Sequence, residues 1–209
     1  MSISCNFALL EQKSKAYSGN DNKEELSIND TEITCEVYED ISLIKKELAN
    51  NDFHYVEEFT LDDIYMYDSN TGEFAEKDGR ITNTLIIRYV NENDKKIICK
   101  KRSYDNNGFE IGTEKTTLKI QDIEVAEKLL NILGYKRFLR MIDKNYMYEN
   151  ENYIAYIQEV EGLGTFLEIE TKNKENAEVE IQKLIELVKT LQLKTGTKFD
   201  IRKAEMLYK

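Results

Sequence analysis

The chain has 209 residues, a length that fits one large domain or one domain with a tail. Its formal net charge of −11 argues against a general nucleic-acid binder, because such proteins hold phosphates with many Lys and Arg side chains. No run of 18 or more apolar residues occurs, so we expect no membrane span, and the first ten residues do not have the pattern of a signal peptide.

The chain begins with a segment that we interpret as an N-terminal extension, residues 1–30, ahead of a folded domain at residues 31–209. Residues 19–25 are polar and have no periodicity. Residues 7–10 are apolar enough to dock on the domain or to form a short element of their own.

From residue 31 onward, the hydrophobic pattern predicts an α+β fold. Alternating or β-forming residues predict strands at residues 31–38, 55–59, 63–67, 84–91, 95–102, 109–120, 138–148, 153–160 and 166–171. Apolar residues at helical spacing predict helices at residues 40–51, 122–134 and 176–193, and the tail at 199–208 fits neither pattern. Strands and helices do not alternate one by one, which argues against a Rossmann or P-loop fold.

Several predicted strands carry polar residues along one face and apolar residues along the other. In the first strand, for example, Ile33, Cys35 and Val37 alternate with polar neighbours. If helices cover the apolar faces, the polar faces must line another space. A closed or nearly closed antiparallel barrel with a polar lumen satisfies that pattern.

The cysteines and the single histidine do not predict a catalytic centre. Cys5, Cys35 and Cys99 are far apart and form no CxxC pair or zinc spacing, which favours reduced thiols and a cytoplasmic protein. We expect Cys35 and Cys99 to lie in buried strands, and His54 to be structural.

One segment identifies a family. Residues 162–170 read Gly-Leu-Gly-Thr-Phe-Leu-Glu-Ile-Glu and follow a strand that ends at Glu159-Val160. This run resembles the CYTH domain of the triphosphate tunnel family, and it is most similar to the class IV adenylyl cyclase branch. Leu133-Gly134-Tyr135 and the order of elements over residues 32–193 agree with the resemblance. It implies an eight-stranded antiparallel tunnel-like β-barrel with flanking helices.

The resemblance also implies a metal site in the tunnel, because acidic residues of the family hold a divalent cation such as Mg or Mn. The residues carried over are Glu32 on the first strand and the pair Glu168 and Glu170 on the last one. Residues i and i+2 of a strand share a face, so the last two can act together. Carboxylate oxygens are suitable ligands for these hard cations.

Basic residues of the family hold the phosphates, and here the resemblance implies Arg88, Lys100, Lys101 and Lys115. Only one of Lys100 and Lys101 can face the lumen, because neighbouring strand residues point to opposite sides.

Other cationic positions of the family pattern are replaced. The family's ExExK motif corresponds here to Glu32, Thr34 and Glu36, and Asp143 and Asn145 stand where a Lys-x-Arg pair is expected. We therefore expect a depleted phosphate-binding side.

Two functions remain open from the sequence. The resemblance implies a protein that binds ATP or another triphosphate with a divalent metal, and that cyclises or hydrolyses it. The alternative is a CYTH fold that has lost catalysis and acts as a nucleotide- or phosphate-binding module or in protein interaction. The family also implies a homodimer.

Overall fold

The computed structural model describes residues 31–70, 76–77, 80–81, 83–91, 93–173 and 176–208. The expected extension at residues 1–30 lies outside the described residues. Within them, no helix has the length and apolar composition needed to cross a membrane.

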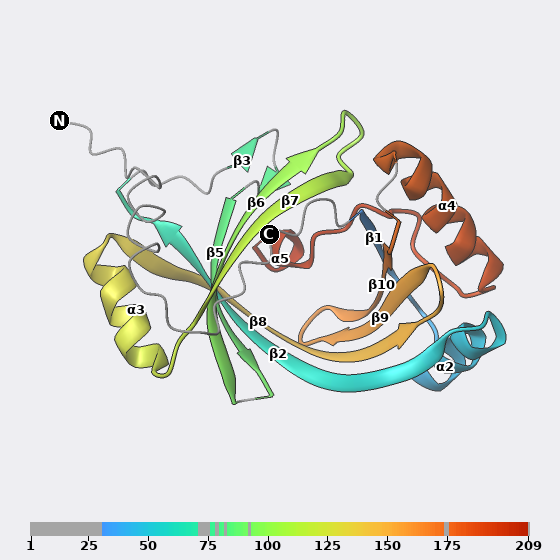
Figure 1. Ribbon diagram of the computed structural model, residues 1–209, viewed down its shortest axis with the longest axis horizontal. Helices are drawn as coiled ribbons and strands as arrows, with labels where there is room; N and C mark the ends of the chain where they lie inside the picture. Colours follow the sequence, from blue (N-terminus) through green and yellow to red (C-terminus); the bar gives the residue numbers. More distant parts are fainter. Residues whose placement is uncertain are drawn as a thin grey trace.

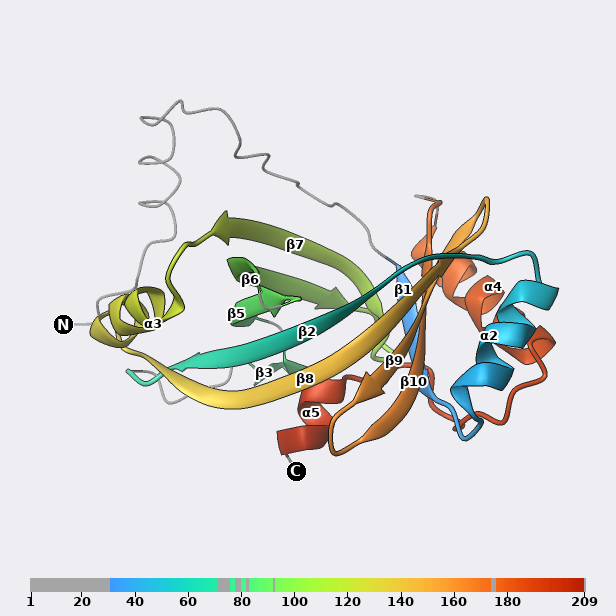
Figure 2. The ribbon, with the colours of Figure 1, turned by 90° about the horizontal axis from the view of Figure 1, so that it is seen from below.

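The described part of the chain is built on one antiparallel eight-stranded sheet that curls around its inner face (Figure 1, Figure 2). In spatial order its strands are β1 (Glu32–Glu36), β10 (Gly164–Thr171), β9 (Tyr153–Val160), β8 (Tyr135–Glu149), β2 (His54–Asp68), β5 (Asn83–Val90), β6 (Asp94–Tyr104) and β7 (Glu110–Lys119). The predicted α+β class and eight-stranded antiparallel sheet are confirmed. Among the described residues, the edge strands β1 and β7 share no backbone pairing, so the sheet forms a half-barrel.

Two details of the strand prediction were wrong. Residues 55–59 and 63–67 were expected as separate strands, but both belong to β2, because the intervening backbone stays paired with β8. Two short strands, β3 (Glu76–Lys77) and β4 (Arg80–Ile81), were not predicted and pair with each other outside the main sheet.

Three helices cover the outer face of the sheet. They are α2 (Ile41–Asn50), α3 (Ile123–Ile132) and α4 (Ala177–Thr190), close to the predicted ranges. Asp122 and Asn176 accept hydrogen bonds from backbone N–H groups in the first turns of α3 and α4, which defines where both helices begin.

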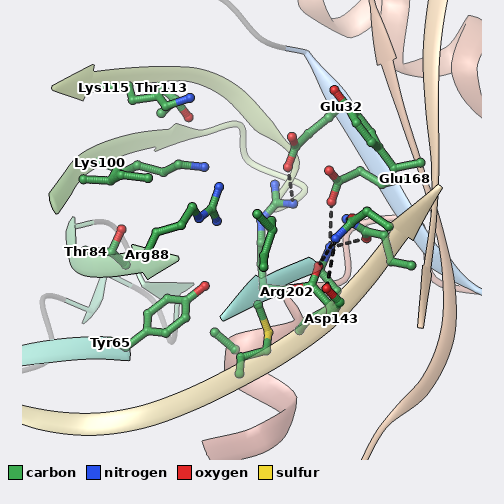
Figure 3. Close-up of a pocket in the computed structure, with 18 of the residues that line it drawn as sticks. Glu32, Tyr65, Thr84, Arg88, Lys100, Thr113, Lys115, Asp143, Glu168 and Arg202 are labelled. Atoms are coloured by element: carbon green, nitrogen blue, oxygen red, sulfur yellow. Dashed lines mark hydrogen bonds and ion pairs between the residues drawn. The ribbon is translucent and has the colours of Figure 1, made fainter. Parts of the chain in front are cut away.

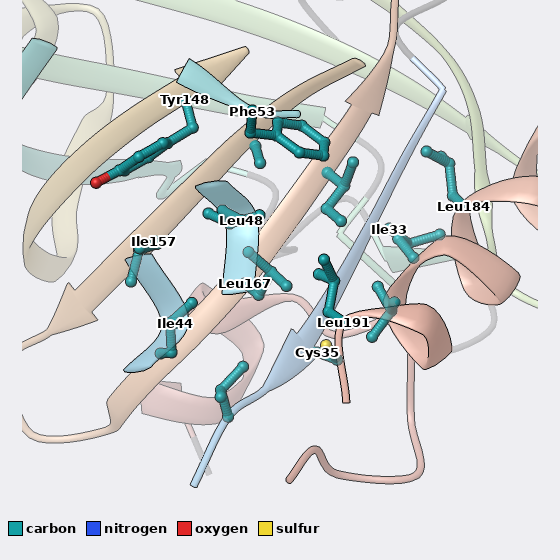
Figure 4. Close-up of a cluster of buried hydrophobic side chains, with 14 of the residues drawn as sticks. Ile33, Cys35, Ile44, Leu48, Phe53, Tyr148, Ile157, Leu167, Leu184 and Leu191 are labelled. Carbon is teal, nitrogen blue, oxygen red and sulfur yellow. The ribbon is translucent and has the colours of Figure 1, made fainter. Parts of the chain in front are cut away.

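The main core lies between α2, α4 and the outer faces of β1, β9 and β10 (Figure 4). Ile33, Leu48, Leu167 and Leu184 are fully buried there. Cys35 is also buried in this cluster, as expected, whereas Cys99 is only half-buried. Since these helices use the apolar side of the strands that they cover, many polar side chains are left for the concave face, beside a smaller apolar cluster that includes Tyr65, Ile98 and Met141.

The C-terminal tail, which had no clear pattern in the sequence, crosses the open edge of the sheet. Thr34 donates its backbone N–H to Phe199 and accepts one from Ile201, so the tail runs beside β1. It continues into a short helix, α5 (Lys203–Tyr208), on the concave side of the sheet (Figure 1). The tail thereby adds its own side chains to the inner surface.

Candidate functional site

The concave face of the sheet encloses a cavity of about 850 Å³, within the usual range for a small-molecule site. Every strand of the main sheet contributes to its lining, and the C-terminal tail contributes the segment from Ile201 to Glu205. The cavity therefore draws together residues from both ends of the described chain.

Acidic residues gather on one side of this cavity. Glu32, Glu168 and Glu170 each offer a carboxylate oxygen, and these atoms lie within 4.8 Å of one another. The pairing of β1 with β10 sets Glu32 directly opposite Glu170, and Glu168 lies two residues along the same strand face. The three expected metal ligands are thus brought together.

The electrostatics of this acidic cluster favour a bound cation. Burial, followed by the neighbouring carboxylates of Glu168 and Glu110, raises the pKa of Glu32 to about 7. Burial also acts to raise the pKa of Glu168, but Lys203 and other cations outweigh it and hold that pKa below its usual value. A hard divalent cation would relieve the repulsion among these crowded carboxylates, which is one of the causes of the raised pKa of Glu32.

Two residues of the C-terminal tail already pair with this cluster. Arg202 places Nη1 3.0 Å from Glu32 Oε1 and Nη2 3.0 Å from Glu110 Oε2, so it connects β1 with β7 across the unpaired edge. Lys203 Nζ lies 2.8 Å from Glu168 Oε2. Sequence reasoning missed both residues, because the tail showed no periodicity from which to place them.

Cationic side chains line the opposite side of the cavity, on three neighbouring strands. Figure 3 shows Arg88, Lys100 and Lys115 pointing into the space that Glu32 and Glu168 face from the other side. The complete set on these strands is Arg88 on β5, Lys96, Lys100 and Arg102 on β6, and Lys115 and Lys119 on β7. The depletion that we expected of the phosphate side therefore does not extend to these three strands, which place six cations in the cavity lining. Lys96, Arg102 and Lys119 were missed, although the alternation along β6 and β7 could have placed them.

Lys101, which we also expected to bind phosphate, does not line the cavity. Its side chain is exposed on the outer face of β6, where Nζ lies 3.7 Å from Glu114 Oε2. Lys100 takes the inward position of that neighbouring pair, as the alternation of strand side chains requires.

The cations differ in how far they are neutralised. Arg88 donates two hydrogen bonds to Asp63, of 2.7 and 2.6 Å, and Arg102 Nε lies 3.2 Å from Glu110 Oε2. Lys100 and Lys115, by contrast, form no hydrogen bond or ion pair within the described parts of the chain. Burial, Arg102 and Arg88 lower the pKa of Lys100 to about 8. This side of the cavity thus holds uncompensated positive charge.

The sixth strand of the family pattern, here β8, presents the replaced residues inward. Asp143 and Asn145 line the cavity and are almost fully buried. The nearby cations Arg140 and Lys144 lie on the outer face, where they pair with Asp62 and Glu58. At this point of the cavity wall, β8 therefore presents Asp143 and Asn145 in place of the basic pair of the family pattern, as expected from the sequence.

Metal-free anion binding is expected to weaken as the pH rises through about 8. The Lys100 ammonium is protonated below its pKa of about 8, so the cavity loses one positive charge as it titrates. Bound phosphate would raise that pKa, so binding takes up a proton. Calorimetric titration with inorganic triphosphate in a chelator should show an affinity loss on the order of tenfold between about pH 7 and pH 9.

Lys100→Met provides the reference for that measurement, since triphosphate and other groups also titrate. The variant should bind more weakly at pH 7 and lose less affinity on going to pH 9. If the affinity for triphosphate falls by the same factor from pH 7 to pH 9 in both proteins, Lys100 is not the group whose titration weakens binding.

A sequence comparison agrees with the geometry. The family model for the CYTH domain matches residues 36–200, which is most of the chain. The chain belongs to the CYTH domain family. No curated protein matches its sequence.

Solved structures of CYTH-like shape match along nearly their whole length. The PH1012 protein of Pyrococcus horikoshii OT3 is 19% identical, with a TM-score of 0.68 over 86% of this chain and 99% of the other. An adenylate cyclase candidate of Vibrio parahaemolyticus is 13% identical, with a TM-score of 0.64 over 86% and 97%. HpAC1 of Hippeastrum, an adenylyl cyclase candidate described as having dominant triphosphatase activity, is 14% identical, with a TM-score of 0.59 over 85% and 93%. At these identities the similarity shows the fold.

Proposed function

We propose that this CYTH protein binds a triphosphate together with a divalent cation, Mg or Mn, and catalyses reaction at one of its phosphorus atoms. One observation carries the proposal: an acidic cluster faces a wall of cations across one cavity, and two of these cations, Lys100 and Lys115, form no ion pair among the described residues. An anionic substrate and a metal cation need complementary charges close together, and this cavity offers both.

In the proposed complex, Glu32, Glu168 and Glu170 hold the cation. Lys100 and Lys115 bind phosphate oxygens, and Arg88 adds to the positive potential although it is shared with Asp63. The bound metal would supply Lewis-acid stabilisation of charge on the phosphate oxygens. The protein side chains orient the triphosphate and stabilise the charge that shifts between its oxygens during reaction.

Two reactions fit such a complex, and the attacking oxygen distinguishes them. Attack of a water molecule on the terminal phosphorus gives hydrolysis, whereas attack of a ribose 3′-hydroxyl on the α-phosphorus of ATP gives cyclisation. The descriptions of two structural neighbours name these same activities, adenylate cyclase and triphosphatase. Fold similarity alone does not choose between them.

The test is a product assay with ATP, inorganic triphosphate and thiamine triphosphate, each with Mg and with Mn. Release of orthophosphate supports the hydrolytic form of the proposal, and cyclic AMP with pyrophosphate supports the cyclising form. If no triphosphate is turned over with either metal, the catalytic proposal is wrong.

A second candidate function, binding without turnover, is favoured by the tail. Arg202 and Lys203 hold two of the three carboxylates that the metal would need. If these ion pairs persist with substrate present, the cavity binds a phosphate compound without catalysis. Metal-independent binding and no product would identify this function.

A further inference from the structure

A continuous hydrogen-bonded chain of buried and half-buried side chains leads from the acidic cluster to Asp143. Lys203 Nζ donates to Glu168 Oε2 and to Gln158 Oε1. Gln158 Nε2 donates to Asn145 Oδ1 over 3.1 Å, and Asn145 Nδ2 donates to Asp143 Oδ2 over 2.9 Å. The chain joins the C-terminal tail to β9 and β8 along the cavity wall.

The direction of every bond in this chain is fixed by its first member. A lysine ammonium has only donors, so it must face the oxygen of the Gln158 amide. The Gln158 nitrogen then faces Asn145, which must present its own oxygen there and its nitrogen to Asp143. Both amides are consequently held in one orientation, and the chain ends on an acceptor.

The end of the chain is an unsatisfied acceptor. Asp143 is 2% exposed, and its Oδ1 has no hydrogen-bonding partner among the described residues. A buried carboxylate oxygen without a donor carries a substantial free-energy cost, so its position calls for an explanation. Because the same carboxyl group lines the cavity, a ligand could supply the missing donor.

The charge of this position excludes a phosphate group as the natural partner. A phosphate oxygen beside the Asp143 carboxylate would bring two anions together, whereas an N–H or ammonium group would meet an acceptor of opposite charge. The cations without an ion-pair partner among the described residues, Lys100 and Lys115, lie on β6 and β7, which the strand order separates from β8 by β2 and β5. We therefore assign the phosphates to the cations and another part of the same ligand to Asp143.

We propose that Asp143 is a specificity-determining residue that accepts a hydrogen bond from an amino or ammonium group on the organic part of a triphosphate ester. This inference rests on the proposed triphosphate function and narrows its substrate class. Inorganic triphosphate, which carries no such group, is then the poorer ligand. Three residues act as positioning residues, because their hydrogen bonds hold the Asp143 carboxyl in place as an acceptor: Gln158, Asn145 and Lys203.

The test compares the affinities of ATP, thiamine triphosphate and inorganic triphosphate by calorimetry, in wild type and in Asp143→Asn. Both esters carry an amino group. Asparagine keeps the side-chain shape and can still accept from Asn145 through its oxygen, but it then presents an N–H group at the open position. At least one ester should bind wild type about tenfold or more tightly than inorganic triphosphate, and Asp143→Asn should remove that preference.

Two further variants show whether the loss of the ester preference in Asp143→Asn comes from the lost acceptor or from a general change in charge or folding. Glu57→Gln removes one negative charge from another part of the same cavity lining and should leave the preference unchanged. Asp143→Lys should reverse it in favour of inorganic triphosphate, a gain that a misfolded protein cannot give. Thermal unfolding of each variant checks that the fold is retained.

The outcomes distinguish the two proposals. If wild type binds inorganic triphosphate as tightly as both esters, or if Asp143→Asn keeps the preference, the role of Asp143 is wrong and triphosphate binding stands. If wild type binds no triphosphate at all, the proposed function fails and this inference fails with it.

Discussion

Glu168→Gln is expected to abolish metal-dependent turnover, with a loss of at least about 100-fold in metal affinity. Glu168 belongs to the three-carboxylate cluster and is central to its charge, since it also raises the pKa of Glu32. Glutamine keeps the shape of the side chain but removes the negative charge that a divalent cation requires. Metal titration followed by calorimetry, and product formation at saturating metal, measure the two effects.

The control for this substitution is Glu114→Gln. It makes the same chemical change at an exposed residue whose partner, Lys101, points away from the cavity. That variant should keep wild-type metal affinity and turnover. If Glu168→Gln turns over substrate at the wild-type rate, the acidic cluster does not take part in catalysis.

Lys100→Ala should weaken triphosphate binding by roughly 10- to 100-fold, the effect of losing one charge-assisted hydrogen bond to an anion. Lys100 lies in the cavity without an ion-pair partner among the described residues, so its charge is available to a ligand. Affinity measured by calorimetry with a triphosphate and metal gives the result directly.

The neighbouring residue supplies a matched control for that experiment. Lys101→Ala removes the same side chain from the opposite face of β6, where it reaches only Glu114. Its affinity for triphosphate should stay within about twofold of wild type, since an exposed ion pair contributes little. Equal losses in both variants would indicate a general charge effect and contradict a cationic wall inside the cavity.

The sequence predicted the fold well because its signals are local and periodic. The alternation around Ile33 and the apolar spacing that includes Leu184 predicted a strand and a helix that meet in the core. The helix at residues 122–134 was predicted from its apolar spacing, and in the structure Asp122 accepts a hydrogen bond from the backbone N–H of Val125 at the start of that helix. The joining of residues 55–67 into one strand was missed, since it depends on pairing with β8, which is distant in sequence.

The candidate site was only partly predictable, for a physical reason. Glu32 and Glu168 could be placed together because a family motif marks them. Arg202 and Lys203 could not, because their tail has little regular structure and takes its position from contacts with β1. The chain of amides that ends at Asp143 is likewise a tertiary feature, formed by three separate elements.

The most direct test of the central claim is calorimetry of the full chain with ATP, thiamine triphosphate and inorganic triphosphate, each with and without Mg or Mn. The account predicts binding at a single site that is strengthened by the metal, is weakened in Lys100→Ala and is unchanged in Lys101→Ala. If the wild-type chain binds none of these compounds in any metal condition, the acidic cluster and the cationic wall do not form a triphosphate site.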